Sequence, residues 1–114
     1  MRRGELIGLI AALVLVAAPG AIAAIASPPD TQINSAKSQV TKGKRITFTF
    51  NADVNGATFE CRRDAEPFSF CTPPKRLTTK HLKLGRHTFA VRAVNAYGTD
   101  PTPAKAGFKV VRPG

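Results

Sequence analysis

The chain has 114 residues and a formal net charge of +10, with 17 lysines and arginines against 7 acidic residues, two cysteines and no tryptophan. This length allows one domain and excludes large multidomain enzymes and most cofactor-binding folds. The basic excess favours negatively charged partners, although charge alone does not name them.

The N-terminal segment has the anatomy of an export signal. Residues 1–3 (Met-Arg-Arg) are a short positive region, and residues 6–18 are apolar, with the length of a signal-peptide core rather than of a membrane span. Residues 24–26 (Ala-Ile-Ala) then form an A-x-A cleavage site. A second such site at residues 21–23 leaves the cleavage point open by a few residues. We expect a signal peptide over 1–26 and a mature domain over 27–114.

An uncleaved membrane anchor is the alternative, because residues 6–26 carry no charge. Under both interpretations Arg2 and Arg3 stay inside and the remainder is exported. The domain is therefore expected to be secreted or to stand on the extracellular face of the membrane or cell envelope. Only the N-terminal segment would contact the membrane, and only if it is not cleaved.

The two cysteines, Cys61 and Cys71, predict one disulfide, because small exported domains commonly pair their cysteines. A bridge over this spacing is worth about 2.5–3 kcal/mol in chain entropy. Metal binding with His81 and His87 is a weaker alternative, since the spacing lacks the tight cysteine knuckle of zinc sites. Two free thiols are the third possibility. No metal site is expected.

Residues 27–114 alternate apolar and polar side chains in short runs, the pattern of half-buried strands. Residues rich in Gly, Pro and Asn separate the runs, and no stretch repeats apolar residues at helical spacing over three turns. The pattern predicts an all-β, antiparallel sandwich or barrel. The expected strands cover 45–50, 57–62, 68–71, 75–79, 87–94 and 106–111.

Short motifs follow one another in a fixed order along this region. They are P-D-T at 29–31, F-x-F at 48–50, A-T-F-E-C at 57–61, Phe68 before Cys71, L-x-x-G-x-H-x-F at 82–89, V-R-A at 91–93 and D-P-T-P-A at 100–104. With these motifs the chain resembles the immunoglobulin-like repeat domains of bacterial extracellular and surface proteins, over roughly residues 29–111. The turn that usually reads Asp-Gly-Gly in that family reads Asp-Ala-Glu at 64–66 here.

The resemblance implies an immunoglobulin-like β-sandwich of about seven strands with a Cys61–Cys71 bridge. The family has no general catalytic activity, and its members usually act as spacers or adhesive modules. Leu82, Gly85 and His87 would form a structural corner. For His87, a role as ligand or general base is the alternative to a corner residue hydrogen-bonded to nearby backbone.

Basic residues gather between positions 75 and 86, where no acidic residue stands. The candidate anion-binding residues are Lys75, Arg76, Lys80, Lys83 and Arg86, and a second cluster is Lys42, Lys44 and Arg45. Such a surface would attract anionic envelope polymers or lipid headgroups. An ordinary solvated basic face is the alternative. Nucleic acid is not expected as a partner, since one tyrosine and no tryptophan provide few stacking platforms.

Catalysis has no support in the sequence. The acidic residues of 27–114 are scattered, no nucleophile elbow is present, and no calcium-loop pattern occurs. We therefore expect no enzyme activity and no cofactor. The expected function is an exported interaction or adhesion module that binds an extracellular protein. The alternative is electrostatic binding of anionic envelope polymers or a membrane surface through a basic face.

Overall fold

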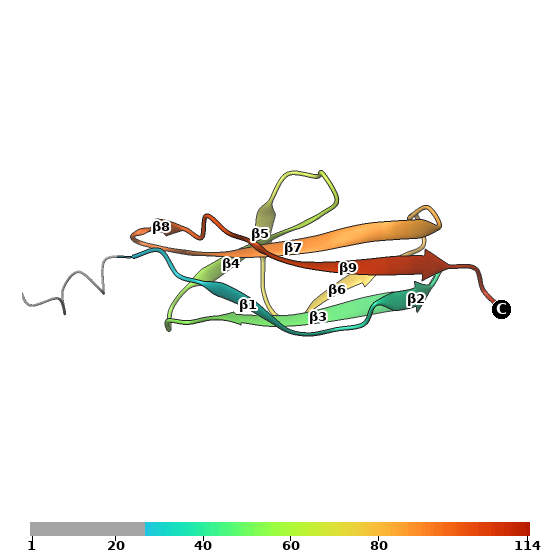
Figure 1. Cartoon of the computed structure of the whole chain (residues 1–114), viewed down its shortest axis with the longest axis horizontal. Helices are drawn as coiled ribbons and strands as arrows, with labels where there is room; N and C mark the ends of the chain where they lie inside the picture. Colours follow the sequence, from blue (N-terminus) through green and yellow to red (C-terminus); the bar gives the residue numbers. More distant parts are fainter. Residues whose placement is uncertain (1–26) are drawn as a thin grey trace, which may run out of the picture.

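The computed structural model describes residues 27–114, which fold into two β-sheets (Figure 1). The expected signal segment, 1–26, lies outside the described residues. Within 27–114 every regular element is a strand, so the all-β prediction is confirmed. The described residues contain no helix long and apolar enough to cross a membrane.

The smaller sheet has three antiparallel strands in the order β1-β3-β6. Its strands are β1 (Thr31–Ala36), β3 (Arg45–Ala52) and β6 (Lys75–Thr78).

The larger sheet has six strands, in the order β2-β9-β7-β4-β5 with β8 added beside β7. Only β2 and β9 run parallel, and the other pairs are antiparallel. Its strands are β2 (Gln39–Thr41), β4 (Thr58–Arg63), β5 (Ser69–Cys71), β7 (Gly85–Asn95), β8 (Gly98–Thr99) and β9 (Ala104–Val111).

The core lies between the sheets, and its largest fully buried side chains are Phe48, Phe89 and Phe108. Successive side chains of a strand point to opposite faces, so the alternation of β3 places Ile46, Phe48 and Phe50 on the inner side. The Phe48 ring stacks on Phe89 of β7 with the centroids 4.0 Å apart. Fully burying a side chain of this kind contributes roughly 1.5–3 kcal/mol, so this inter-sheet stack is a main source of stability.

The structure contains nine strands in residues 27–114, against about seven expected. The strands that the sequence did not predict are β1, β2 and β8. Strands β2 and β8 have three and two residues, too few to display a period of two. Strand β1 offers only Ile33 as a large apolar residue, so its alternation is weak.

The predicted disulfide is present. Cys61 and Cys71 are bonded, with their Cα atoms 5.8 Å apart, and both are 5% exposed. They lie on adjacent antiparallel strands, β4 and β5, on the inner face of the larger sheet. The bond therefore holds the edge strand β5 to β4 within one sheet.

Candidate functional site

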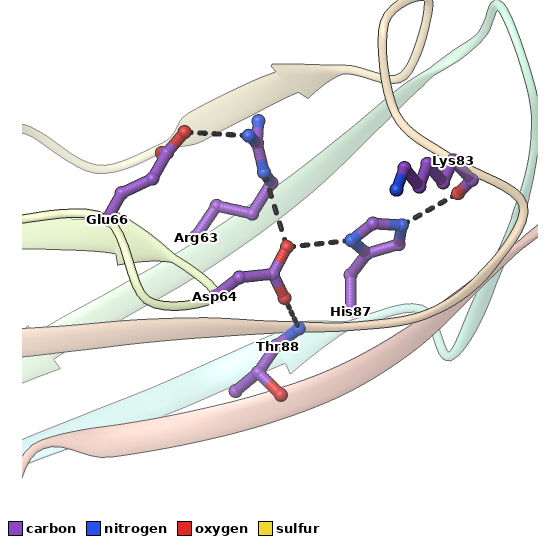
Figure 2. A network of polar contacts seen from close by, with 6 residues as sticks. All are labelled: Arg63, Asp64, Glu66, Lys83, His87 and Thr88. Atoms are coloured by element: carbon purple, nitrogen blue, oxygen red, sulfur yellow. Dashed lines mark hydrogen bonds and ion pairs between the residues drawn. The ribbon is translucent and has the colours of Figure 1, made fainter.

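A polar network around His87 joins the turn after β4 to the start of β7 (Figure 2). Nδ1 of His87 lies 2.8 Å from Oδ2 of Asp64, and its Nε2 lies 2.7 Å from the Lys83 carbonyl oxygen. The other carboxylate oxygen of Asp64 accepts a hydrogen bond from the Thr88 amide at 2.9 Å. The network thus ties three segments of the chain together.

Asp64 occupies a backbone position that few residues adopt. Its φ is +55°, in the left-handed region that Asp and Asn tolerate better than most side chains. Its amide donates to the Thr88 carbonyl at 2.8 Å. Nε of Arg63 lies 3.5 Å from the Asp64 carboxylate, an ion-pair contact without hydrogen-bond geometry, and Nη2 of Arg63 pairs with Glu66 at 2.7 Å. These contacts hold the Asp-Ala-Glu turn in one conformation.

The two ionisable partners favour their charged forms. Burial alone would lower the pKa of His87, but the hydrogen bonds to Asp64 and to the Lys83 carbonyl outweigh it and raise that pKa. Burial alone would raise the pKa of Asp64, but the His87 and Thr88 hydrogen bonds and nearby positive charge lower it. Both ring nitrogens of His87 face acceptors, which only the imidazolium form can satisfy together.

This arrangement differs from a catalytic acid–base pair. A general base needs one free ring nitrogen directed at a substrate proton, and here a carboxylate and a carbonyl occupy both nitrogens of His87. The His87 ring also stacks on Phe108 with the centroids 5.6 Å apart. The geometry makes His87 a brace for the loop that precedes β7. Asp64 is a part of this brace that the sequence analysis did not identify.

The other two corner residues lie beside this brace. Leu82 is 4% exposed and belongs to the core. Gly85 begins β7 with φ of +110°, a backbone conformation that favours glycine over residues with a side chain.

A second network centres on Thr79, which is fully buried and lies between β6 and the loop that precedes β7. Its hydroxyl accepts a hydrogen bond from the Gly43 amide at 2.8 Å and lies 2.7 Å from the Lys44 carbonyl. The Thr79 amide also donates to the Lys44 carbonyl at 3.2 Å. Thr79 therefore joins the β2–β3 turn to the β6–β7 loop, and both carry lysines.

These turns bring together basic residues from distant parts of the sequence at one end of the sandwich, where the C-terminus also lies (Figure 1). Lys42 donates its amide to the Val111 carbonyl and its Nζ to the Leu82 carbonyl, both at 2.8 Å. Arg86 stands opposite Lys109 in the β7–β9 ladder. We define this "basic end" by Lys42, Lys44, Lys80, Lys83, Arg86, Lys109 and Arg112.

Most acidic residues of the described part lie near the start of the domain or pair with arginines, and Asp64, which lies beside Lys83 and Arg86, pairs with His87. Within residues 27–114 no lysine or arginine of the basic end forms a salt bridge. The basic end therefore presents uncompensated positive charge. The carboxylates bond as follows: Asp53 to the Asp30 amide, Asp100 to Thr31 and Thr102, Glu60 to Arg92, Asp64 to His87, and Glu66 to Arg63.

The five candidate anion-binding residues do not share one face. Lys80, Lys83 and Arg86 belong to the basic end. Lys75 and Arg76 are successive residues of β6 and point to opposite sides, Lys75 half-buried and Arg76 exposed. Lys75 lines a small cavity of about 120 Å³ beside the disulfide. The same end of the sandwich also carries Lys109, which stands opposite Arg86, and Arg112, which directly follows β9; neither was among the predicted residues.

Two arginines stack on Phe68 on the outer face of the larger sheet. The guanidinium carbons of Arg62 and Arg92 lie 4.4 and 3.9 Å from its ring centroid, and Arg92 also pairs with Glu60 at 2.8 Å. Ala90 stands opposite Arg62 on this face and is nevertheless 2% exposed. The outer face is therefore covered locally by side chains from the β4–β5 turn.

Metal ligation has no arrangement to support it in residues 27–114, where no three His, Cys, Asp or Glu side chains are grouped to hold an ion. A scan against protein-family models finds no match for the chain, and a search of curated proteins finds none either.

Proposed function

We propose that this chain is an exported, non-catalytic immunoglobulin-like domain that acts as an interaction module at the cell surface or in secreted form. The observation that carries the proposal is the basic end, a cluster of lysines and arginines that form no salt bridge within residues 27–114. His87 and Asp64, the pair closest to a catalytic arrangement, are both occupied in bracing a loop.

The strand order supports the immunoglobulin-like assignment. Constant-type immunoglobulin sandwiches place the first, second, fourth and fifth strands of their pattern in one sheet and the third, sixth and seventh in the other. Here β1, β3 and β6 form one sheet, and β4, β7 and β9 lie together in the other. The strand at the fourth place, β5, departs from that arrangement, because it pairs with β4 in the larger sheet. The disulfide departs from the antibody pattern, because it joins neighbours in one sheet instead of crossing the core.

The alternative, electrostatic binding of anionic envelope polymer or a membrane surface, is favoured by a specific observation, the charge separation along the sandwich. The chain begins β1 at one end of the domain and presents the basic end at the other (Figure 1). A segment preceding residue 27 would therefore leave the basic end free to meet a polyanion.

The test is binding of the full-length chain, purified in a neutral detergent, to the envelope fraction of its source cells at increasing salt. Raising the salt from about 0.01 M to about 0.15 M shortens the screening length from about 30 Å to about 8 Å. We expect binding to weaken steeply over this range, and to weaken further in the double variant Lys80→Gln/Lys83→Gln.

The matched control is Arg76→Gln/Lys105→Gln, which removes the same charge from outer strand faces away from the basic end. Equal loss in both double variants would contradict a role for the basic end. Salt-insensitive binding would instead support a protein partner held by another surface. Absence of binding at every salt concentration would contradict the interaction module, and substrate turnover that His87→Gln abolishes would contradict a non-catalytic role.

A further inference from the structure

The first part of the domain is divided between the two sheets, and this division leaves part of β3 without a neighbour. Strand β1 pairs with β3 from Ala52 back to Phe48, and the chain then crosses over so that β2 pairs with β9. Residues 45–47 of β3 pair with β6 on one side. On the other side, where β1 pairs with the rest of β3, these residues have no partner strand among the described residues. A cleft lies at this position, between β2 and β3.

The ladder between β3 and β6 shows which backbone groups of β3 face this cleft. The Thr79 amide donates to the Lys44 carbonyl in the same register that pairs Arg45 with Thr78. Hydrogen-bonded and non-hydrogen-bonded pairs alternate in an antiparallel ladder. Ile46 therefore directs its N–H and C=O toward β6, whereas Arg45 and Thr47 direct theirs away from it, toward the cleft.

The opposite wall of the cleft is also a strand edge. The Lys109 amide donates to the Ser38 carbonyl, and the Lys42 amide donates to the Val111 carbonyl, so the even-numbered residues of this segment bond to β9. By the same alternation Gln39 and Thr41 direct their amides away from β9.

The cleft has about 370 Å³ of free volume. Val40 and Ile46 are the apolar residues that line it; Val40 is half-buried, and Ile46 belongs to the core and is 2% exposed. Three cations line it and no acidic residue does. They are Lys37, Lys44 and Arg45.

We propose that this cleft, which we call the β2–β3 cleft, binds an extended acidic peptide segment of a partner protein, which pairs with the free edge of β3. An extended chain supplies N–H and C=O groups at the spacing that Arg45 and Thr47 offer, and its acidic side chains would meet the three cations. Strand addition of this kind gives affinity through main-chain bonds and specificity through alternate side chains. The inference rests on the proposed interaction function and names a partner class for it.

Two other occupants fit less well. A second copy of this chain carries the same formal charge of +10, so its approach to a basic cleft is opposed by repulsion. A polyphosphate or an anionic polysaccharide would satisfy the cations but would leave the donors and acceptors of the β3 edge without the alternating partners that a peptide supplies.

The test uses the hexapeptide acetyl-Asp-Val-Asp-Val-Asp-Val-amide and the full-length chain in neutral detergent, followed by amide hydrogen exchange. We expect slower exchange of the Arg45 and Thr47 amides when the peptide is added. The Ile46 amide is already bonded to β6, so its exchange should change little. This alternation is specific for strand pairing and would be absent if the peptide were held by charge alone.

Two double variants with equal changes in net charge separate the cleft from the basic end. Lys37→Glu/Arg45→Glu should weaken peptide affinity by about tenfold or more, since both cations face the peptide. Lys80→Glu/Lys83→Glu changes the total charge by the same amount at the basic end and should leave the affinity within a few-fold.

A peptide methylated at every backbone amide keeps its charges and loses its donors, and we expect it not to bind. The proposal would be overturned if the methylated peptide or short-chain polyphosphate bound as tightly as the unmodified peptide. It would also be overturned if both double variants bound the peptide with equal affinity. Protection spread over residues outside the β2–β3 cleft would also overturn it. Failure of the envelope fraction to bind, together with alternate protection of Arg45 and Thr47, would contradict the proposed function and leave the cleft assignment standing.

Discussion

His87 and Thr79 show how single residues act in this domain, because the polar atoms of each side chain form hydrogen bonds within the chain itself. His87 bonds a carboxylate and a carbonyl at 2.8 and 2.7 Å, and its side chain is 11% exposed. Thr79 is fully buried and contacts three backbone groups through one hydroxyl. Both residues hold the β6–β7 loop, which carries Lys80 and Lys83. The placement of the basic end therefore depends on His87 and Thr79, which are not among its lysines and arginines.

The His87–Asp64 pair predicts a stability maximum in the mildly acidic range. The pKa of His87 is raised, so its contribution is complete below the ordinary value of 6.5 and is lost as pH rises through the folded-state pKa. The pKa of Asp64 is lowered, so its contribution is present above the ordinary value of 3.8 and is lost as pH falls through the folded-state pKa. Urea midpoints measured between those limits should exceed those at pH 8.5 or above. His87→Gln should abolish the alkaline loss, and an unchanged profile in that variant would contradict the assignment.

Replacing Thr79 by valine keeps its shape and removes its hydroxyl. The Gly43 amide then loses its acceptor in a part-buried hydrogen bond, and losing a hydrogen bond of this kind costs about 0.5–1.5 kcal/mol. Denaturant unfolding of Thr79→Val should show this loss of stability. Thr78→Val is the matched control, because Thr78 is exposed and its hydroxyl makes only a 3.4 Å contact to the Lys80 amide. Similar midpoints for the two variants would argue against the role of Thr79.

At the scale of elements, β5 is a short edge strand of the larger sheet. It has three residues, lies at the sheet edge and pairs only with β4. Its central residue, Phe70, is 70% exposed. Edge strands invite pairing with other chains, and short length is one of the ways in which proteins limit it. The disulfide fixes this short strand, and the stack of Phe68 between arginines covers the turn that leads to it.

Removing the disulfide should therefore act mainly on the β4–β5 hairpin. The chain-entropy contribution of a bridge with this separation is about 2.5–3 kcal/mol. Reduction, or the double variant Cys61→Ala/Cys71→Ala, should lower the free energy of unfolding by about that amount, as measured in guanidinium. In hydrogen exchange, the amides of β5 should lose protection before those of β7. A uniform loss over both sheets would contradict this local role.

At the scale of the whole molecule, the basic residues and the start of the domain occupy opposite ends of the sandwich (Figure 1). Asp30, Asp53 and Asp100 lie near the start, where the Asp53 carboxylate accepts from the Asp30 amide and the Asp100 carboxylate accepts from the amides of Thr31 and Thr102. Within residues 27–114 the lysines and arginines of the basic end form no salt bridge, although Lys42 donates its Nζ to the Leu82 carbonyl. The salt dependence proposed above follows from this separation, because an exposed unpaired charge attracts polyanions over the screening length.

Much of the fold could be predicted from local patterns. The alternation of Ile46, Phe48 and Phe50 indicated a strand with one buried face, and the cysteine pair indicated a staple; the structure confirms both. The separation of Lys75 from Arg76 could also have been inferred, since neighbours in a strand point to opposite sides. Lys75 and Arg76 therefore lie on opposite sides of β6, and anion binding by the five residues stays a prediction.

Other features could not be predicted, because they depend on contacts between residues far apart in the chain. Nothing in the local sequence distinguishes Thr79, which is buried and hydrogen-bonded to the β2–β3 turn, from its neighbour Thr78, which is exposed. The pairing of Asp64 with His87 joins positions separated by 23 residues. Sequence distance carries no information about such pairs until the register of β4 against β7 is known.

Residue types and a period of two were enough to predict the strand class, the inward faces, the disulfide and the excess of positive charge. The position of that charge, the groups that remain unpaired and the division of β1 and β2 between the sheets depend on tertiary contacts. Those outcomes depend on strand order, which is set by the packing of the phenylalanine core and not by any local pattern. The basic end and the β2–β3 cleft are both products of that order.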